Sequence, residues 1–232
     1  DLIVKIAIIV PMAEEAEYYH TNFQFNEIKK YGITEYIHGF IGNNEVFIGL
    51  SGIGKVNAAM NITSLLVNEK IDLIFITGSA GALQTNIHQY DLVCPDAFRY
   101  FDAHNTMAGD YVEGQIPQEP AEYDLNSMLR DDFIEYLQAK KIKYFSGLAV
   151  TGDSFIATFE TKNAILKNFP DALCVEMEGA AFAQVASKFG VPLVALRAIS
   201  DNAANEAAVD FDIFVKNVAK KAASIICDYL KN

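Results

Sequence analysis

The sequence has no apolar run that reaches the roughly 18 residues expected of a membrane-spanning helix. Its apolar opening, residues 2–10, is interrupted by Lys5 and lacks the basic start and small-residue cleavage pattern of a signal peptide. Cysteine is scarce: Cys94, Cys174 and Cys227 lie far apart in apolar segments, which predicts buried free thiols and a reducing compartment. We therefore expect a cytoplasmic protein.

Positive charge is also in short supply. Lys and Arg number 18 against 30 Asp and Glu, which leaves a net charge of −12 with neutral His. Because nucleic-acid binding depends on neutralising phosphates with Lys and Arg, this balance argues against a nucleic-acid partner. No metal site or cofactor is expected, because ligand-like spacing is absent among the cysteines and the four histidines.

Strand and helix patterns alternate along the whole chain. Apolar runs predict buried strands at 2–10, 72–77, 91–94, 144–150, 173–176 and 192–200. Apolar residues at helical spacing predict helices at 13–23, 55–69, 124–140, 160–168, 179–189 and 211–230. A hairpin is predicted at 36–50, around Gly42-Asn43-Asn44, and a loop at 104–122. With no linker or repeat in this order, we expect one α/β domain over residues 1–232, with a mostly parallel sheet covered by helices.

Five of the predicted strand ends are rich in Gly, Ser or acidic residues. In sheets of this kind, ligands gather beyond the carboxyl ends of the strands. The sequence therefore predicts a ligand site built from residues 12–15, 52–54, 78–81, 176–178 and 200–201.

Two of these segments come close to known motifs without matching them. Residues 49–55 approach a phosphate-binding loop, but Val56 replaces the hydroxyl residue that would bind magnesium, and Asn57 replaces the third glycine of a dinucleotide fingerprint. Residues 78–81 do not match the nucleophile elbow, and Ser79 has no obvious histidine partner. We interpret both as glycine-rich turns, the first allowing close approach of a ligand and the second binding a polar ligand with its amides or hydroxyl.

The carboxylates are more informative as a group than singly. Glu15 lies in a first helical turn, where acids favour the helix dipole, and Asp201 follows the last strand, where it could cap a turn. Glu176 and Glu178 straddle Met177, and the alternation of a strand places both on one side. Acidic residues at three strand ends of one sheet favour an acid-lined site.

Six segments, in order and spread over nearly the whole chain, carry a family resemblance. They are 12–15 (MAEE), 51–56 (SGIGKV), 77–81 (TGSAG), 151–156 (TGDSFI), 175–179 (VEMEG) and 197–201 (RAISD). Together they resemble the superfamily of purine nucleoside phosphorylases and nucleosidases, above all its hydrolases of 5′-methylthioadenosine and S-adenosylhomocysteine. The resemblance implies a three-layer α/β fold with a mixed, mostly parallel central sheet, and a homodimer.

The resemblance also implies roles for individual residues. Glu15 corresponds to the base that activates water, and Asp201 to the acid that protonates N7 of the departing adenine. Glu178, beside Met177, corresponds to the group that binds the ribose hydroxyls and supports the positive charge on the sugar. Phe155 would stack on the purine, the backbone of Ile156 would read its edge, and Gly81 with Ser79 would lie near ribose and base. The apolar slot for the alkylthio tail would be lined by Met12, Ile53 and Phe211.

The expected chemistry needs this set of groups. Cleavage of an N-glycosidic bond passes through an oxocarbenium-like sugar, which nearby anions stabilise more than the ground state. Adenine leaves only after N7 is protonated, so an acid must be protonated near pH 7 when substrate is bound. The base must lie on the opposite face of the sugar with room for water, as in inverting glycoside hydrolysis.

Water is favoured over phosphate as the nucleophile. Related phosphorylases hold phosphate with arginines near the first loop and two residues before the glycine of the Gly-Ser motif. Here residues 12–17 contain no arginine, the second position is Ile76, and the whole chain has three arginines. The alternatives are a phosphate-dependent phosphorylase, a non-catalytic nucleoside-binding protein, and a hydrolase of deoxyadenosine or a futalosine-like compound.

Residues 104–113 match the family less cleanly. In the family, an aromatic or apolar residue of this stretch enters the tail pocket of the neighbouring subunit. Met107 and Tyr111 are both candidates for that role.

Overall fold

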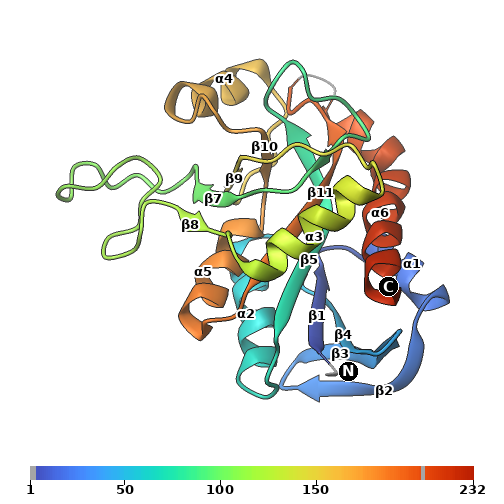
Figure 1. Cartoon of the computed structure of the whole chain (residues 1–232). Coiled ribbons are helices and arrows are strands. Elements are labelled where there is room, and N and C mark those ends of the chain that lie inside the picture. Colours follow the sequence, from blue (N-terminus) through green and yellow to red (C-terminus); the bar gives the residue numbers. More distant parts are fainter. Residues whose placement is uncertain (1–3, 205–206) are drawn as a thin grey trace.

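The computed structural model describes residues 4–204 and 207–232, without the side chains of 14, 15, 208–210, 212, 213 and 216. Strands and helices are interspersed along the described chain (Figure 1). The strands are β1 (Lys5–Val10), β2 (Gln24–Tyr31), β3 (Thr34–Ile41), β4 (Asn44–Leu50), β5 (Leu73–Ala82), β6 (Leu92–Val93), β7 (Ala97–Tyr100), β8 (Tyr123–Asp124), β9 (Leu148–Thr151), β10 (Cys174–Glu176) and β11 (Leu193–Asp201). The helices are α1 (Ala13–Thr21), α2 (Lys55–Leu66), α3 (Met128–Ala139), α4 (Phe159–Asn168), α5 (Gly179–Phe189) and α6 (Ala207–Lys231).

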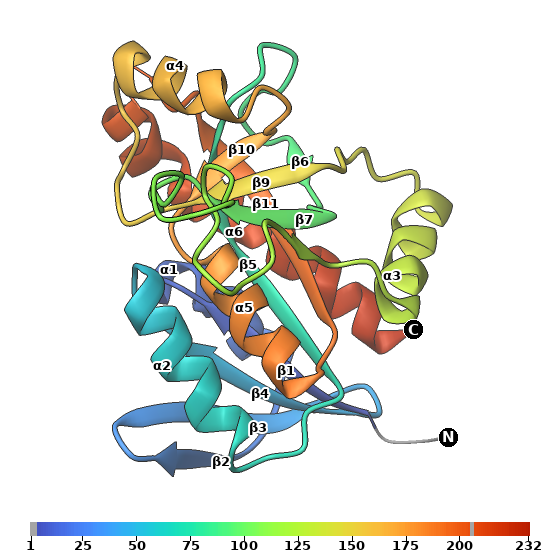
Figure 2. The ribbon, with the colours of Figure 1, turned by 90° about the vertical axis from the view of Figure 1, so that its left-hand side faces the viewer.

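The strands form one mixed sheet in the order β2-β3-β4-β1-β5-β10-β9-β7-β8, with β11 paired to β5 and β6 to β11. The central strands β4, β1, β5 and β11 pair in parallel, and so do β10, β9 and β7. Strand direction reverses between these two sets, where β10 pairs antiparallel with the end of β5. Figure 2 shows β2, β3 and β4 at one end of the molecule and β7, β9 and β10 at the other, with β5 running between them.

Helices cover both faces of the sheet. Figure 1 shows α2 and α5 on one side of β5, and α1 and α6 on the other. Strand β1 serves both layers: Ala7 and Ile9 pack into the core under α2 and α5, whereas Ile6, Ile8 and Val10 pack into the core under α1, α3 and α6. A strand buried on both faces needs a continuous apolar run, which is the pattern of this segment. The predicted three-layer α/β fold with a mixed, mostly parallel central sheet is confirmed.

Three strands carry no clear sequence signal. Strand β2 is an edge strand with mostly exposed side chains, so it has little apolar periodicity, and its pairing with β3 holds it in place. Strands β7 and β8 are short and pair with each other. The predicted helix at 124–140 begins at Met128 instead, because Ser127 accepts a hydrogen bond from the backbone N–H of Arg130 and starts the helix there.

None of the described helices is both long and apolar enough to span a membrane.

Candidate functional site

A pocket of about 330 Å³ opens at the carboxyl ends of the central strands. All five predicted strand-end segments contribute residues to its lining, and the binding of a ligand there stays a prediction. The pocket lies where the direction of the strands reverses beside β5. The described residues that line it are Pro11, Met12, Ile53, Ser79, Ala80, Gly81, Ser154, Phe155, Ile156, Val175, Glu176, Met177, Glu178, Ser200, Asp201 and Phe211.

The predicted glycine-rich turn at 78–81 is wrong. Strand β5 continues through Gly78 and Gly81 to Ala82, because β11 and β10 pair with this segment on its two sides. Gly81 has no Cβ and so allows the Asp201 side chain to pack directly against it; no turn requires a glycine here. A Cβ at this position would lie 2.8 Å from Oδ1 of Asp201 and 2.9 Å from the Cβ of Ala203.

Asp201 ends β11 and is buried, with 3% of its surface exposed. Its Oδ1 accepts a hydrogen bond from the backbone N–H of Ala203 (2.7 Å), and its Oδ2 accepts one from the Ser200 hydroxyl (2.7 Å). Ala203 has a φ of +55°, a left-handed conformation that is uncommon for a residue other than glycine. The chain thus turns sharply after Asp201 and holds this carboxyl group in one position at the pocket wall.

Glu176, at the end of β10, is fully engaged with the protein. Its Oε2 accepts hydrogen bonds from the backbone N–H groups of Glu178 (3.2 Å) and Gly179 (2.7 Å), at the start of α5. The same oxygen accepts a hydrogen bond from the buried guanidinium of Arg197, and the other oxygen accepts one from the Thr151 hydroxyl. This carboxylate therefore caps α5 and neutralises Arg197.

Glu178 has fewer partners and faces the same pocket. Its Oε2 accepts a hydrogen bond from the backbone N–H of Gly54 (3.1 Å), and its Oε1 lies 3.8 Å from Nη2 of Arg197. Burial raises the pKa of the Glu178 carboxyl to about 7; the nearby Arg197 opposes this shift, and the Glu176 carboxylate adds to it. Both glutamates line the pocket, but Glu178 lies beyond the end of β10 and directly before α5, so the strand alternation from which their shared side was predicted does not extend to it. The sequence signal for the buried Arg197 was an arginine within an otherwise apolar strand.

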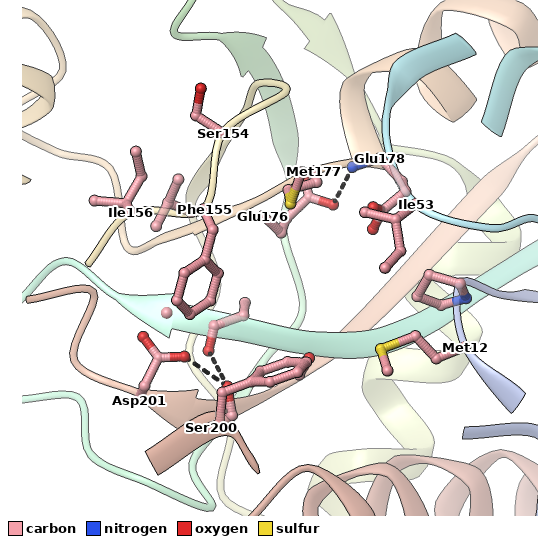
Figure 3. A pocket seen from close by; sticks show the side chains of 16 residues that line it. Met12, Ile53, Ser154, Phe155, Ile156, Glu176, Met177, Glu178, Ser200 and Asp201 are labelled. Carbon is pink, nitrogen blue, oxygen red and sulfur yellow. Dashed lines mark hydrogen bonds between the residues drawn. The ribbon is translucent and has the colours of Figure 1, made fainter. Parts of the chain in front are cut away.

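Apolar side chains complete the walls. Phe155 is 47% exposed, and its ring packs edge-on against that of Phe211, with centroids 5.8 Å apart. Figure 3 shows Asp201 and Phe155 toward one end of the pocket, and Glu178, Ile53 and Met12 toward the other. An acidic group thus lies toward each end of the lining.

The remaining predicted residues fall into two groups. The lining includes every residue predicted to bind a ligand: Met12, Ile53, Ser79, Gly81, Phe155, Ile156, Met177, Glu178 and Phe211. The side chain of Glu15 lies outside the described residues, although its backbone lies in α1, directly after the lining residues Pro11 and Met12. The other lining residues were given no individual role from the sequence, and each lies within two positions of a residue that was: Pro11, Ala80, Ser154, Val175, Glu176 and Ser200.

No arginine or lysine stands among the described residues of the lining. The three arginines of the chain are engaged elsewhere. Arg99 donates to the backbone carbonyl of Glu113, Arg130 donates to the backbone carbonyl of Pro95, and Arg197 holds Glu176. Within the described part of the chain, no group of three His, Cys, Asp or Glu side chains is arranged to hold a metal ion.

The segment predicted to reach a neighbouring subunit lies outside this pocket. The loop between β7 and β8, which contains residues 104–113, projects from the body of the molecule (Figure 1). Met107 is 97% exposed on it, and Tyr111 is partly buried. Neither side chain lines the pocket of its own chain.

Comparisons with known proteins place this geometry in a family. Residues 5–231 match the family model of the phosphorylase superfamily. The 5′-methylthioadenosine/S-adenosylhomocysteine nucleosidase of Staphylococcus aureus is 39% identical over 222 residues, covering 95% of this chain and 96% of the relative. The structure of S-adenosylhomocysteine nucleosidase from Streptococcus pyogenes in complex with 5-methylthiotubericidin aligns with a TM-score of 0.94 at 36% identity, covering 99% of this chain and 97% of that one. Futalosine hydrolase of Helicobacter pylori aligns with a TM-score of 0.91 at 30% identity, covering 97% of this chain and 96% of that one.

Proposed function

Since this chain belongs to the phosphorylase superfamily, and within it to the family of 5′-methylthioadenosine/S-adenosylhomocysteine nucleosidases, we propose that it hydrolyses the N-glycosidic bond of these two nucleosides. The products are adenine and the corresponding thioribose. The observation that carries the proposal is a pocket with Asp201 beside Phe155 toward one end and Glu178 beside Ile53 toward the other. A nucleoside has the same polarity, with a flat base at one end and a hydroxylated sugar at the other.

Asp201 is the general acid of the proposed reaction. Adenine is a poor leaving group until a proton is placed on N7, and a buried carboxyl group can supply that proton when the bound base excludes water. The hydrogen bonds from Ala203 and Ser200 support this role, because they hold the carboxyl group in one orientation beside the wall formed by Phe155 and Ile156. Phe155 stacks on the purine in this arrangement.

Glu178 holds the sugar. Its neighbour Glu176 is occupied by Arg197 and the start of α5, so Glu178 is the carboxyl group of the pair that remains for a ligand. It accepts hydrogen bonds from the ribose hydroxyls, and its negative charge stabilises the oxocarbenium-like transition state more than the neutral substrate. Met177, Gly81 and Ser79 contact the ribose and base from the adjoining strand ends.

Glu15 activates the attacking water. In this proposal it acts from the start of α1, on the face of the sugar opposite the departing base. Met12, which precedes that helix, forms the apolar slot for the alkylthio tail together with Ile53 and Phe211.

The nucleophile is water rather than phosphate. A phosphate dianion placed among carboxylates needs guanidinium groups to hold it, and the three arginines of the chain have other partners. The decisive test follows adenine release from methylthioadenosine and adenosylhomocysteine with and without phosphate. Equal rates in phosphate-free buffer are expected, and strict phosphate dependence would establish a phosphorylase instead.

A second candidate substrate deserves the same assay. The likeness to futalosine hydrolase over nearly the full chain favours including futalosine, and deoxyadenosine tests the need for the ribose 2′-hydroxyl. We expect kcat/KM to be higher for methylthioadenosine than for either compound. A non-catalytic nucleoside-binding protein would show no turnover of any of them.

The active assembly is a homodimer in this proposal. Ile53 lines the pocket yet is 49% exposed, and Met107 is almost fully exposed on the projecting loop. A second subunit that covers this mouth with Met107 or Tyr111 would close the tail slot. No nucleic acid or membrane is involved.

A further inference from the structure

Three loops meet beside the pocket, and each contributes one charged side chain. Lys55 begins α2, Asp102 follows β7, and Asp153 lies between β9 and α4. None of the three lines the pocket. We call them the loop clamp (Lys55, Asp102 and Asp153).

Each member of the loop clamp contacts the other two. The backbone N–H of Lys55 donates to Oδ1 of Asp153 (2.8 Å), and the backbone N–H of Asp153 donates to Oδ2 of Asp102 (2.9 Å). The Lys55 ammonium donates to both oxygens of Asp102 (2.9 and 3.0 Å) and lies 3.8 Å from Oδ2 of Asp153. The same ammonium lies 5.3 Å from the centre of the Tyr100 ring. These contacts form a closed circuit of charge-assisted hydrogen bonds.

The loops that the clamp joins carry opposite ends of the pocket. Gly54, next to Lys55, donates its N–H to Glu178, and Ile53 lines the pocket just before it. On the other loop, Phe155 and Ile156 follow Asp153 closely and line the pocket near Asp201. The clamp therefore ties the wall that faces the sugar to the wall that faces the base.

The fit at this junction is close. Gly54 has a φ of +96°, and a Cβ on it would lie 3.1 Å from Oδ1 of Asp153. A glycine here lets the Asp153 carboxylate reach the start of α2 without steric conflict.

We propose that Asp153 is a positioning residue, which sets the distance between the base wall and the sugar wall so that a whole nucleoside fits both at once. This inference rests on the proposed function in one respect: it takes Phe155 as the base contact and Glu178 as the sugar contact. A small misplacement of either wall lowers the reaction rate steeply, because the reacting groups must meet in one geometry. Adenine alone touches one wall and does not depend on the distance between the two.

The test compares Asp153→Ala and Asp153→Asn with the unmodified protein. Asp153→Ala removes both contacts to Lys55, so we expect kcat/KM for methylthioadenosine to fall about tenfold or more. Asp153→Asn keeps an oxygen that accepts the Lys55 N–H, so most of the activity should return, to within about threefold of the unmodified protein. The affinity for free adenine, measured by calorimetry, should change by less than about twofold in both variants.

Ser127→Ala is the matched control. Ser127 also accepts a hydrogen bond from a backbone N–H at the start of a helix, but it begins α3 and does not line the pocket. It should lose stability as Asp153→Ala does while keeping kcat/KM. Unchanged kcat/KM in Asp153→Ala, or an equal loss of adenine affinity, would overturn the inference.

The proposed function and the positioning role of Asp153 can be refuted independently of each other. If the unmodified protein released no adenine, the proposed function would fail. The clamp would still be tested by calorimetry, with adenine and a non-hydrolysable 5′-methylthio nucleoside analogue as the two probes. In that case the inference predicts that Asp153→Ala lowers affinity for the analogue and spares affinity for adenine, and equal effects on both would refute it.

Discussion

Glu176 and Glu178 are two residues apart and chemically identical, but their surroundings give them different tasks. Glu176 accepts hydrogen bonds from two backbone N–H groups, a hydroxyl and a guanidinium, so its charge is paired within the protein. Glu178 accepts one backbone N–H and lies at a greater distance from Arg197. The buried Arg197 thus serves mainly as the counterion of Glu176, and the proposed site uses the glutamate that remains.

Replacing Asp201 tests the proposed acid. Asp201→Asn keeps the shape of the side chain and removes the proton donor, so we expect kcat to fall by roughly two to four orders of magnitude while substrate still binds. Single-turnover kinetics and calorimetry with methylthioadenosine measure the two effects. Near-wild-type turnover would rule out this acid; Asp171→Asn, an exposed aspartate outside the site, is the control.

The pH dependence of stability tests the burial of Glu178. Because burial raises the pKa of this carboxyl from 4.5 to about 7, the unfolded chain binds fewer protons than the folded protein between these values. Its contribution to the free energy of unfolding therefore falls as pH rises from about 4.5 to 7 and is constant above that range. The slope of one such group is at most about 1.4 kcal/mol per pH unit.

Glu178→Gln removes this titration. Urea unfolding at pH 5 and pH 8 should show that the variant gains stability relative to the unmodified protein as pH rises. The exposed Glu135→Gln on α3 provides the comparison and should leave the pH dependence as it is. The same pH dependence in Glu178→Gln and the unmodified protein would show that Glu178 is ionised at no cost in the folded state.

At the scale of elements, the end of β5 organises the site. On one side it pairs with β11, which ends in Asp201, and on the other with β10, which ends in Glu176. The small residues at 78–81 let both neighbouring strands approach without filling the pocket. Strand β11 runs with β5 and β10 runs against it, so Asp201 and Glu176 come to the same part of β5 from opposite directions.

Gly81→Ala tests this packing. A Cβ would collide with Oδ1 of Asp201 and with Ala203, so the acid must move, and we expect kcat/KM to fall by roughly a hundredfold. Steady-state kinetics measure this loss. Gly190→Ala, at the end of α5, has open space but a φ of +70°, so it should cost stability and leave kcat/KM unchanged. Full activity in Gly81→Ala would show that Asp201 tolerates displacement.

The start of α5 depends on Glu176. Glu176→Gln removes the charge that neutralises the buried Arg197, so we expect the free energy of unfolding to fall by about 3 kcal/mol or more. Urea unfolding measures this quantity. Glu35→Gln breaks the exposed ion pair with Lys30 and should have a far smaller effect, because surface ion pairs contribute little. Equal effects of the two substitutions would contradict the structural role of Glu176.

At the scale of the whole molecule, the pocket is open on the side where Ile53 and Phe155 are half exposed. The loop between β7 and β8 projects away from the body and presents Met107 to its surroundings (Figure 1). In the proposed reaction, a second subunit that closes this mouth would keep bulk water away from the cationic sugar.

The mass in solution tests this assembly. Light scattering after size-exclusion chromatography should give about twice the 25.6 kDa of one chain. Met107→Asp together with Tyr111→Asp should lower the affinity for methylthioadenosine and spare that for adenine, because the loop is expected to meet the tail and not the base. A mass of one chain with full activity would exclude the dimer as the working form.

The sequence by itself determined the order of most elements and the edge of the sheet that carries the site. Local periodicity indicates whether a segment is buried on one face or on two, and the continuous apolar run of β1 indicates both faces. The segments rich in Gly, Ser and acidic residues could be located because each follows a predicted strand in the chain. The sequence did not predict β2, whose exposed side chains have little periodicity, or the continuation of β5 through Gly78 and Gly81. In both cases pairing with a neighbouring strand decided the outcome.

The family resemblance implied the ribose role for Glu178, but the physical difference between Glu176 and Glu178 appears only in the tertiary structure. Their sequence context is nearly symmetrical about Met177, so no local pattern distinguishes them. The difference comes from Arg197 and from Gly54, whose N–H reaches Glu178 from 124 positions away in the chain. Desolvation and charge pairing depend on which atoms surround a carboxylate in space, and that arrangement exists only once β5, β10 and β11 lie side by side. The same holds for Lys55, Asp102 and Asp153, whose mutual contacts form only when three separate loops meet.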